Sequence, residues 1–411
     1  MEVEQTLQYP FPPYQYNING NGESWYNVNP DTGYTFPADG NNVIRLTLNS
    51  TNQVASLYSS YFRFKVVPTD NAGTSVINAN GLASCIERVR VLVAGVQVDD
   101  ISNYGDMVMD ESYTYASENR KTMLYQTEGF RNPEALVTGS AWCYHQPLLS
   151  LFRVNKEFPL PVIPGSGVQI EIYLKPSRNF FVSTAGVTTP SGYSVQEFSW
   201  NMPMKSPPAQ YLEDLKDGVA KGQSIWLPYV QTKTQIQYFS GSNESEFVTV
   251  TGPSNSIQSI SHRFVSASDY NDPTKDKNLI SKSMGLQEWY LAYGSTKLPN
   301  VRNFKYSNNS PVDFETHLIQ YITALGGDYS DDVNITDFTT LDNENFKISY
   351  NWLQTTERFG TGLMLLDANA QIRTHVICSD PVAATTRCET LFFRDALLEI
   401  NPTLVQVHTV W

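Results

Sequence analysis

Short strand-like segments in the first half of this 411-residue chain recur, in the same order, in the second half. The matched pairs are 61–64 with 261–264 (offset 200), 90–95 with 288–294 (offset 199 at the glycines), 169–172 with 371–374 (offset 202) and 198–200 with 398–400 (offset 200). One such match means little, because alternating β sequence is common, but random matches would scatter in their spacing. The chain is therefore interpreted as two β domains in tandem.

Length and composition agree with a tandem arrangement. A chain of 411 residues fits two domains, each able to bury its own core. Aromatic residues make up 12% of the chain and favour strands, while charged residues make up only 17%. A proline-rich seam at 202–208 separates the halves. We predict an extended arm over 1–40, a first domain over 41–205, a linker over 206–217 and a second domain over 218–411.

Most of the sequence after residue 42 reads as short strands. The segment 168–174 alternates strictly and places Val168, Ile170, Ile172 and Leu174 on one face, because side chains alternate at period two. The segment 86–98 reads as a hairpin that turns at 94–95. The predicted fold class is all-β, with two tandem eight-stranded jelly rolls and few short helices.

Two helices are expected. Residues 207–217 can form a short helix that a proline opens near its first turn and Gly218 stops. Residues 313–325 carry an apolar stripe, with Asp313 as the N-cap and a Gly-Gly pair at 326–327 as the stop. A helix inserted between strands would cover a sheet edge or carry a contact between subunits.

Both ends of the chain are apolar and aromatic where free tails are normally polar. Residues 1–40 show no sustained periodicity, and two readings stay open: a strap that docks on a neighbouring subunit, or a strap on its own domain. The segment 404–411 is expected near contacts between subunits. No signal peptide follows Met1, and no apolar run approaches the length of a spanning helix.

Charge and cysteine content exclude some functions. A net charge of −13 repels phosphates and disfavours nucleic-acid binding. The cysteines Cys85, Cys143, Cys378 and Cys388 lack CxxC spacing and lie in strand-like sequence, which indicates buried thiols rather than a disulfide framework. Cys378 and Cys388 could also face each other across a hairpin, although a reducing cytosol is the simpler setting.

The chain carries no motif for catalysis, cofactor binding or a metal site. GxxxxGK[ST], GxGxxG, GxSxG and HExxH are all absent. Cys143 and His145 could supply two metal ligands, but a structural role in a strand is the better reading. The acidic segments 99–100, 269–272 and 328–332 are interpreted as turns or solvated loops. We therefore predict no catalytic, cofactor-binding or metal-binding residue, and no enzyme.

Two passages resemble a known family. Residues 86–104, a strand, a small turn, a strand and then Ile-x-x-Tyr, look like a passage of the double jelly-roll major capsid proteins of icosahedral double-stranded DNA viruses. Residues 148–152, 158–161 and 168–174 look like the passage that closes the first roll of those proteins. The family includes virophage, polinton-like virus and adenovirus-lineage capsid proteins.

The resemblance implies a homotrimer whose six rolls form a pseudo-hexagonal tile of a viral shell in the virion. Its partners would be itself, neighbouring capsomers, and penton and minor capsid proteins; an internal membrane is left open, and sequence-specific nucleic-acid binding is not expected. Two alternatives remain. Trp289 and Trp352 would suit a carbohydrate-binding or carbohydrate-active β-sandwich, and a minor capsid, penton or spike protein would share the fold.

Overall fold

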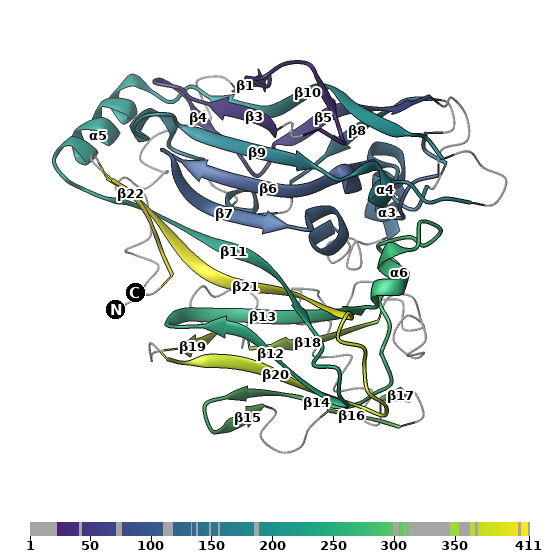
Figure 1. Ribbon diagram of the computed structural model, residues 1–411. Coiled ribbons are helices and arrows are strands. Elements are labelled where there is room, and N and C mark those ends of the chain that lie inside the picture. The colour runs from purple at the N-terminus through teal and green to yellow at the C-terminus, as the bar shows by residue number, and fades with distance from the viewer. Residues whose placement is uncertain are drawn as a thin grey trace.

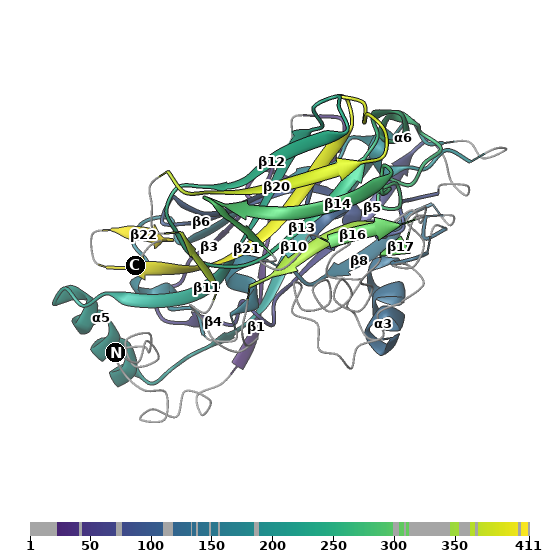
Figure 2. The same ribbon diagram turned by 90° about the horizontal axis from the view of Figure 1, so that it is seen from below.

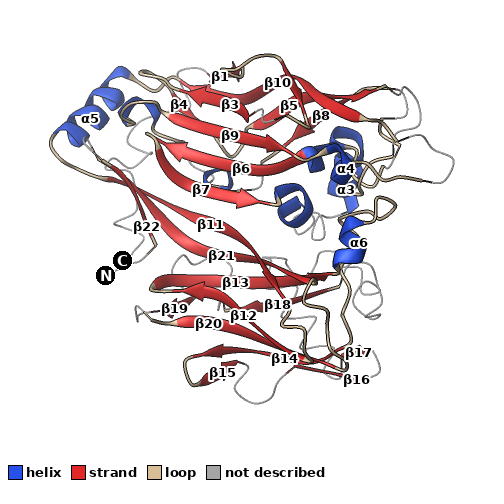
Figure 3. Ribbon diagram, viewed as in Figure 1, coloured by secondary structure: helices blue, strands red, loops and turns tan. Residues whose placement is uncertain are grey.

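The computed structural model describes residues 23–40, 43–70, 76–109, 118–132, 134–136, 139–147, 149–154, 157–184, 189–298, 304–307, 310–311, 346–352, 362–365, 369–401 and 404–409. Figure 3 shows that strands dominate this part of the chain and that its few helices gather at the two ends of the strands. The helix predicted over 313–325 and the acidic segment 328–332 lie outside the described residues.

The first half folds into a sandwich of two antiparallel sheets. One sheet has the order β1-β10-β5-β8, with β2 and β4 also paired to β10, and the other has the order β3-β9-β6-β7. The elements are β1 (Glu23–Val28), β2 (Thr35–Pro37), β3 (Val43–Leu48), β4 (Val54–Ala55), β5 (Tyr61–Thr69), η3 (Leu82–Cys85), β6 (Ile86–Val93), β7 (Val96–Ser102), η4 (Tyr104–Val108), α3 (Glu118–Glu128), β8 (Ala141–His145), η5 (Ser150–Arg153), η6 (Leu160–Val162), β9 (Val168–Leu174), α4 (Ser177–Phe180) and β10 (Gly192–Lys205).

The sequence pattern explains these strands. In β5, Phe62, Phe64 and Val66 are fully buried while the residues between them are half exposed, so the strand buries one face. The predicted hairpin is confirmed: β6 and β7 meet at a turn in which Ala94 and Gly95 have φ values of 50° and 81°. Two positive φ values match the turn that suits the twist of paired strands.

The second half folds into a second sandwich. One sheet has the order β11-β21-β13-β18, with β22 and β19 at its sides, and the other has the order β12-β20-β14-β16-β17, with β15 paired to β14. The elements are α5 (Ala209–Ala220), β11 (Ile225–Tyr238), β12 (Glu244–Thr251), β13 (Ser254–Val265), α6 (Ala267–Asn271), β14 (Leu286–Tyr293), β15 (Thr296–Leu298), β16 (Phe304–Ser307), β17 (Ser310–Pro311), β18 (Lys347–Asn351), β19 (Leu363–Leu365), β20 (Gln371–Cys378), β21 (Arg387–Ile400) and β22 (Val405–His408).

The two sandwiches repeat one topology. The order β1-β10-β5-β8 matches β11-β21-β13-β18, and the order β3-β9-β6-β7 matches β12-β20-β14-β15. All four sequence matches fall on equivalent strands: β5 with β13, β6 with β14, β9 with β20, and β10 with β21. The predicted tandem repeat and the all-β fold class are therefore confirmed.

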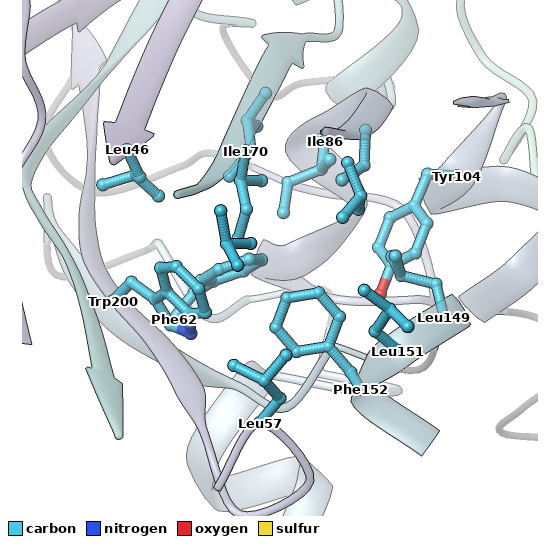
Figure 4. Close-up of a cluster of buried hydrophobic side chains, with 14 of the residues drawn as sticks. Leu46, Leu57, Phe62, Ile86, Tyr104, Leu149, Leu151, Phe152, Ile170 and Trp200 are labelled. Carbon is cyan, nitrogen blue, oxygen red and sulfur yellow. The ribbon is translucent and has the colours of Figure 1, made fainter. Parts of the chain in front are cut away.

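Two hydrophobic cores result, and they are unequal. The first fills the first sandwich, where Phe152 packs against Phe62 and Trp200 (Figure 4). It also continues onto one face of the β11-β21 sheet, through residues such as Leu391 and Phe393. The second core fills the second sandwich around residues that include Phe264 and Trp289. The sheet of the second sandwich that contains β11 and β21 thus faces the first sandwich (Figure 1).

Part of the predicted arm belongs to the first sandwich. Strands β1 and β2 lie within 1–40 and both pair with β10. For these residues the strap lies on its own domain, while residues 1–22 lie outside the described part of the chain. At the other end, β22 continues the β21 sheet as a side strand.

The seam helix α5 forms, but it runs past the predicted stop. Gly218 lies inside α5, buried, and the helix ends at Ala220. Gly222, with φ of 87°, provides the left-handed residue, and its amide donates to the Val219 carbonyl at 2.9 Å. Pro208 is the N-cap rather than a first-turn residue. Among the described residues no helix is both long and apolar enough to span a bilayer.

Candidate functional site: the buried junction between the two sandwiches

The edge strand of the first sandwich lies against the first strand of the second. Side chains of β11 reach the Val98 carbonyl of β7: Gln231 Nε2 donates at 2.8 Å and the Tyr229 hydroxyl at 3.2 Å. The Ser102 amide donates to Thr234 Oγ1 at 3.1 Å. These contacts supply partners to the edge of β7, which would otherwise present unpaired backbone groups.

Asp99 lies at the centre of this contact, and the sequence reading of 99–100 as a turn was wrong. Both residues belong to β7, and Asp99 is fully buried. The Thr232 amide of β11 donates to Asp99 Oδ2 at 3.2 Å, and Lys233 Nζ lies 3.9 Å from Oδ1. Burial raises the pKa of the Asp99 carboxyl to about 7, although Lys233 acts in the opposite direction.

This raised pKa predicts a pH dependence of stability. Because the folded state holds the Asp99 proton more tightly than the unfolded state, Asp99 contributes stability that is complete below about pH 4 and is lost as pH rises through about 7. We expect this contribution to make the free energy of unfolding fall between about pH 4 and pH 7, and Asp99→Asn to make that fall shallower by up to ~1.4 kcal/mol per pH unit. Urea unfolding at each pH measures this; an unchanged slope would contradict it, and Asp217→Asn, on the exposed face of α5, is the control.

A cluster of buried charges joins the sandwiches beyond β7. Lys175 and Asp106 of the first half form an ion pair, and both are buried. In the second half, Glu389 is only 1% exposed, accepts from Arg263 Nε at 2.6 Å and forms an ion pair with Arg387, whose Nη2 lies 2.9 Å from Glu389 Oε1. Arg263 Nη1 then donates to the Asp106 carbonyl at 3.0 Å, which links the two pairs across the junction.

Local irregularities in the backbone of the first sandwich bring its charged side chains to this cluster. Asp106 lies in the π-helical turn η4, and Lys175 directly follows β9. Glu87 sits where the β6–β9 register shifts, a β-bulge that re-aims a side chain. Burial raises the pKa of the Glu87 carboxyl, against the opposing effect of Lys175. Burial lowers the pKa of the Lys175 ammonium, but Asp106 and Glu87 outweigh it, so that pKa is raised.

A third contact between the two halves involves the segment that precedes η3. Asp276, in the segment after α6, accepts from the backbone amide of Ala79 at 2.6 Å and of Asn278 at 3.0 Å. The Ser183 amide donates to the Pro273 carbonyl at 2.8 Å. Burial raises the pKa of the Asp276 carboxyl to about 6. The second half therefore forms hydrogen bonds with the first half at three separate places.

The junction fixes a single relative orientation of the sandwiches. A purely apolar contact tolerates sliding, whereas buried charges are costly in any arrangement that separates them from their partners. With β21 buried on both faces and hydrogen bonds crossing the boundary from Arg263 to the Asp106 carbonyl and from the Thr232 amide to Asp99, the described residues form one block rather than two tethered domains.

The buried histidines, including His145, which was considered as a metal ligand, make hydrogen bonds to side chains of their own sandwich. His145 is hydrogen-bonded on both sides: its Nε2 lies 2.7 Å from the Tyr104 hydroxyl and its Nδ1 lies 3.1 Å from Glu128 Oε1. These two bonds connect η4, β8 and α3. His262 bridges Thr390 and Thr374 inside the second sandwich, and burial lowers its pKa to about 3. Among the described residues no cluster of three or more His, Cys, Asp or Glu side chains is arranged to hold a metal ion.

The thiol prediction is confirmed. All four cysteines are free and buried. Cys378 lies in β20 and Cys388 in β21, which belong to opposite sheets of the second sandwich, so no hairpin joins them. Burial raises the pKa of all four thiols, to about 12 for Cys85 and about 11 for Cys378.

Two further sequence readings are corrected. Trp289, proposed as a sugar platform, is a core residue with 1% exposure, and Trp352 packs against the same core. Residues 269–272, read as a turn, lie in and directly after the short helix α6, where Ser266 Oγ accepts from the Asp269 amide at 3.2 Å. That capping contact converts the turn sequence into one helical turn.

The sequence matches no protein-family profile and no curated protein. Solved structures do match. PBCV-1 VP54, fitted into a cryo-EM reconstruction of the virophage Sputnik, superposes with a TM-score of 0.66 at 10% identity, over 94% of this chain and 97% of that one. The Faustovirus major capsid protein gives 0.59 at 9% identity over 98% and 94%. The mavirus major capsid protein gives 0.51 at 9% identity over 100% and 94%.

These superpositions include both sandwiches, since they span nearly the whole of each chain. They agree with the twofold repeat of topology and with the resemblance of residues 86–104 and 148–174, which form the β6-β7 hairpin and the β9 region. At identities near 10% the likeness establishes architecture. The chain therefore has the double jelly-roll fold of viral major capsid proteins.

Proposed function

We propose that this protein is a major capsid protein, and that three copies form a pseudo-hexameric capsomer of an icosahedral viral shell. The observation that carries the proposal is the full-length match, in both sandwiches, to proteins that are themselves major capsid proteins. The mature location would be the shell of a virion. Its partners would be further copies of itself, neighbouring capsomers, and penton and minor capsid proteins, with an internal membrane left open.

The junction supports a structural role. A shell tile has to transmit force between its neighbours without bending. A tandem of two rolls held by buried hydrogen bonds between them, donated by side chains of a buried ion-pair cluster, gives such a unit. Two similar rolls in one chain also let a threefold assembly occupy a hexagonal lattice site. The net charge of −13 argues against direct contact with a genome.

A second candidate is carbohydrate binding. It is favoured by one surface groove of about 600 Å³ on the second sandwich, which Glu246, Tyr293, Arg373 and His375 help to line. Next to it, His375 stacks on Tyr290 with ring centroids 4.6 Å apart. Aromatic and charged groups of this kind can bind sugars, but the tryptophans offered for this function are buried. A minor capsid, penton or spike role would share the fold and differ in copy number.

Native mass spectrometry of the full chain with negative-stain microscopy tests the proposal. We expect a species of three times 46.2 kDa that forms hexagonal arrays or shells at high concentration. A chain that stays monomeric at high concentration, or specific glycan binding on an array that is lost on Arg373→Ala, would contradict the capsid function.

A further inference from the structure

Lys175 and Asp106 form a pair that is closed to solvent. Lys175 Nζ donates to Asp106 Oδ1, and the two side chains are 0% and 6% exposed. This hydrogen bond places the lysine nitrogen beside Cγ, the carbon to which Oδ1 is bonded. A second carboxyl, that of Glu87, is near enough to interact electrostatically with both groups. An amine, a carboxyl carbon and a group that can carry a proton are the three parts that amide formation requires.

Close packing and hydrogen bonds hold the backbone around Asp106 in place. Gly105 precedes Asp106, and a Cβ atom at Gly105 would lie 2.6 Å from the Ser84 carbonyl oxygen. Only glycine therefore lets η4 approach the segment that leads into Glu87. Asn80 Nδ2 also donates to the Gly105 carbonyl at 2.9 Å. The carboxyl carbon of Asp106 is thus presented from a fixed position.

The same segment holds the backbone of Lys175. The Lys175 amide donates to the Cys85 carbonyl at 2.7 Å, and the Lys175 carbonyl accepts from the Tyr193 hydroxyl at 2.6 Å. Glu87 follows Cys85 by two positions, at the bulge where the β6–β9 register shifts. All three side chains therefore start from backbone that is fixed around residues 84–87. Groups held in this way react as if present at about 10⁵–10⁸ M.

Exclusion of water changes the chemistry of the pair. In water an ammonium and a carboxylate are both well hydrated and do not condense. Burial removes that hydration, so the neutral amine and the neutral acid, which differ from the ion pair by one proton transfer along the hydrogen bond, become accessible. Burial also raises the pKa of the Glu87 carboxyl, which favours its protonated form as a hydrogen-bond donor.

We propose that Lys175 and Asp106 join in an isopeptide bond between Nζ and Cγ, which forms inside the folded first sandwich with Glu87 as the proton carrier. The reaction needs no other molecule, because it joins groups of one chain and releases only water. The bond is internal to one copy, so the inference does not depend on the proposed function.

The reaction is a condensation without any change of oxidation state. The ammonium first gives one proton to the carboxylate, which leaves a neutral amine and a neutral acid. The amine nitrogen attacks Cγ, while protonated Glu87 donates a hydrogen bond to the oxygen that becomes negative in the tetrahedral intermediate. The bond from Cγ to the hydroxyl then breaks, and one proton passes from the nitrogen through Glu87 to the hydroxyl, which leaves as water. One amide and one water result, and Glu87 ends in its starting form.

The bond would close a covalent ring around the segment that carries α3. Residues 106 and 175 are 69 positions apart. The chain between them includes α3 and β8, which lie side by side at one end of the first sandwich (Figure 2). The Asp106 carbonyl also accepts from Arg263 of the second sandwich at 3.0 Å, so the link lies at the junction. A crosslink at this position would stabilise the fold by restricting the unfolded chain.

Mass spectrometry of the denatured full chain tests the inference. We expect the wild type to be lighter than its sequence by one water molecule. After tryptic digestion we expect peptides 91–120 and 157–178 to be joined, with the link between Lys175 and Asp106. Lys175→Met and Glu87→Gln should each keep the full sequence mass. Glu87→Gln is the sharper test, because it leaves both reacting groups in place and removes only the proton carrier.

The control is the ion pair of Lys282 with Asp269. Its Nζ and Oδ2 atoms are 2.8 Å apart, but the Lys282 side chain is 43% exposed. Lys282→Met should therefore lose one water as the wild type does, and no peptide linked through Lys282 should appear.

Three outcomes would contradict the inference. A folded wild type that keeps its full sequence mass overturns it. A water loss confined to peptide 91–120 also overturns it, since that would be an aspartate cyclised onto its own backbone. A full yield of the linked peptides from Glu87→Gln overturns the role assigned to Glu87. If Lys175→Met does not fold, the wild-type mass and the linked peptides decide the question.

Discussion

Glu389→Gln is expected to lower the free energy of unfolding by about 3–5 kcal/mol, because it leaves two buried guanidinium groups without their carboxylate. Glu389 accepts from Arg263 and forms an ion pair with Arg387, and glutamine keeps the shape of the side chain while removing its charge. Since Arg263 also holds the Asp106 carbonyl, the loss should extend across the junction. Denaturant unfolding followed by tryptophan fluorescence measures it.

The matched control is Asp217→Asn. Asp217 and Lys221 form an ion pair on the exposed face of α5, 3.9 Å apart, with both side chains more than two-thirds exposed. Exposed pairs contribute little, so this variant should stay within about 0.5 kcal/mol of the wild type. Equal stabilities for the two variants would show that the buried cluster does not hold the sandwiches together. A two-step unfolding curve in Glu389→Gln alone would place the damage at the junction.

Trp200→Ala is expected to cost about 3–5 kcal/mol, and Trp25→Ala to leave monomer stability within about 0.5 kcal/mol of the wild type. Trp200 is fully buried in β10 and packs against Phe152, whereas Trp25, in the neighbouring strand β1, is 61% exposed. The two substitutions remove the same side chain from opposite faces of one sheet. Thermal unfolding of dissociated monomer compares them, and a similar loss for both would mean that Trp25 already packs within its own chain.

The fold could be predicted from the sequence because topology repeats while sequence detail has diverged. The pairing registers make Thr374 the equivalent of Ile170. The sequence match, with its offset of 202, had paired Ile170 with Ile372 instead, which is two residues away. For β10 and β21 the equivalent of Trp200 is Thr390 rather than Ile400, a shift of ten. Both shifts are even, so the matched residues still share a sheet face, and an approximate repeat was enough to identify equivalent strands.

The junction could not be predicted in the same way. Asp99 and Asp100 lie in the middle of β7, but two consecutive aspartates after a short apolar run usually mean a turn, so nothing local indicates that β11 will cover Asp99. Glu87, Asp106 and Lys175 come together only because a bulge, a π-helical turn and a strand end meet at one place. Gly218 was read as a helix stop because glycine often follows a helix, but it is a buried helix residue and Gly222 provides that conformation.

The four buried thiols have a practical consequence. With their pKa values raised by burial, Cys85, Cys143, Cys378 and Cys388 remain protonated at neutral pH and are shielded from reagents. A cysteine introduced at any exposed position would therefore be the single reactive thiol of the chain. Fluorophores, gold particles or peptides could be attached at one defined point per copy without first removing the native cysteines.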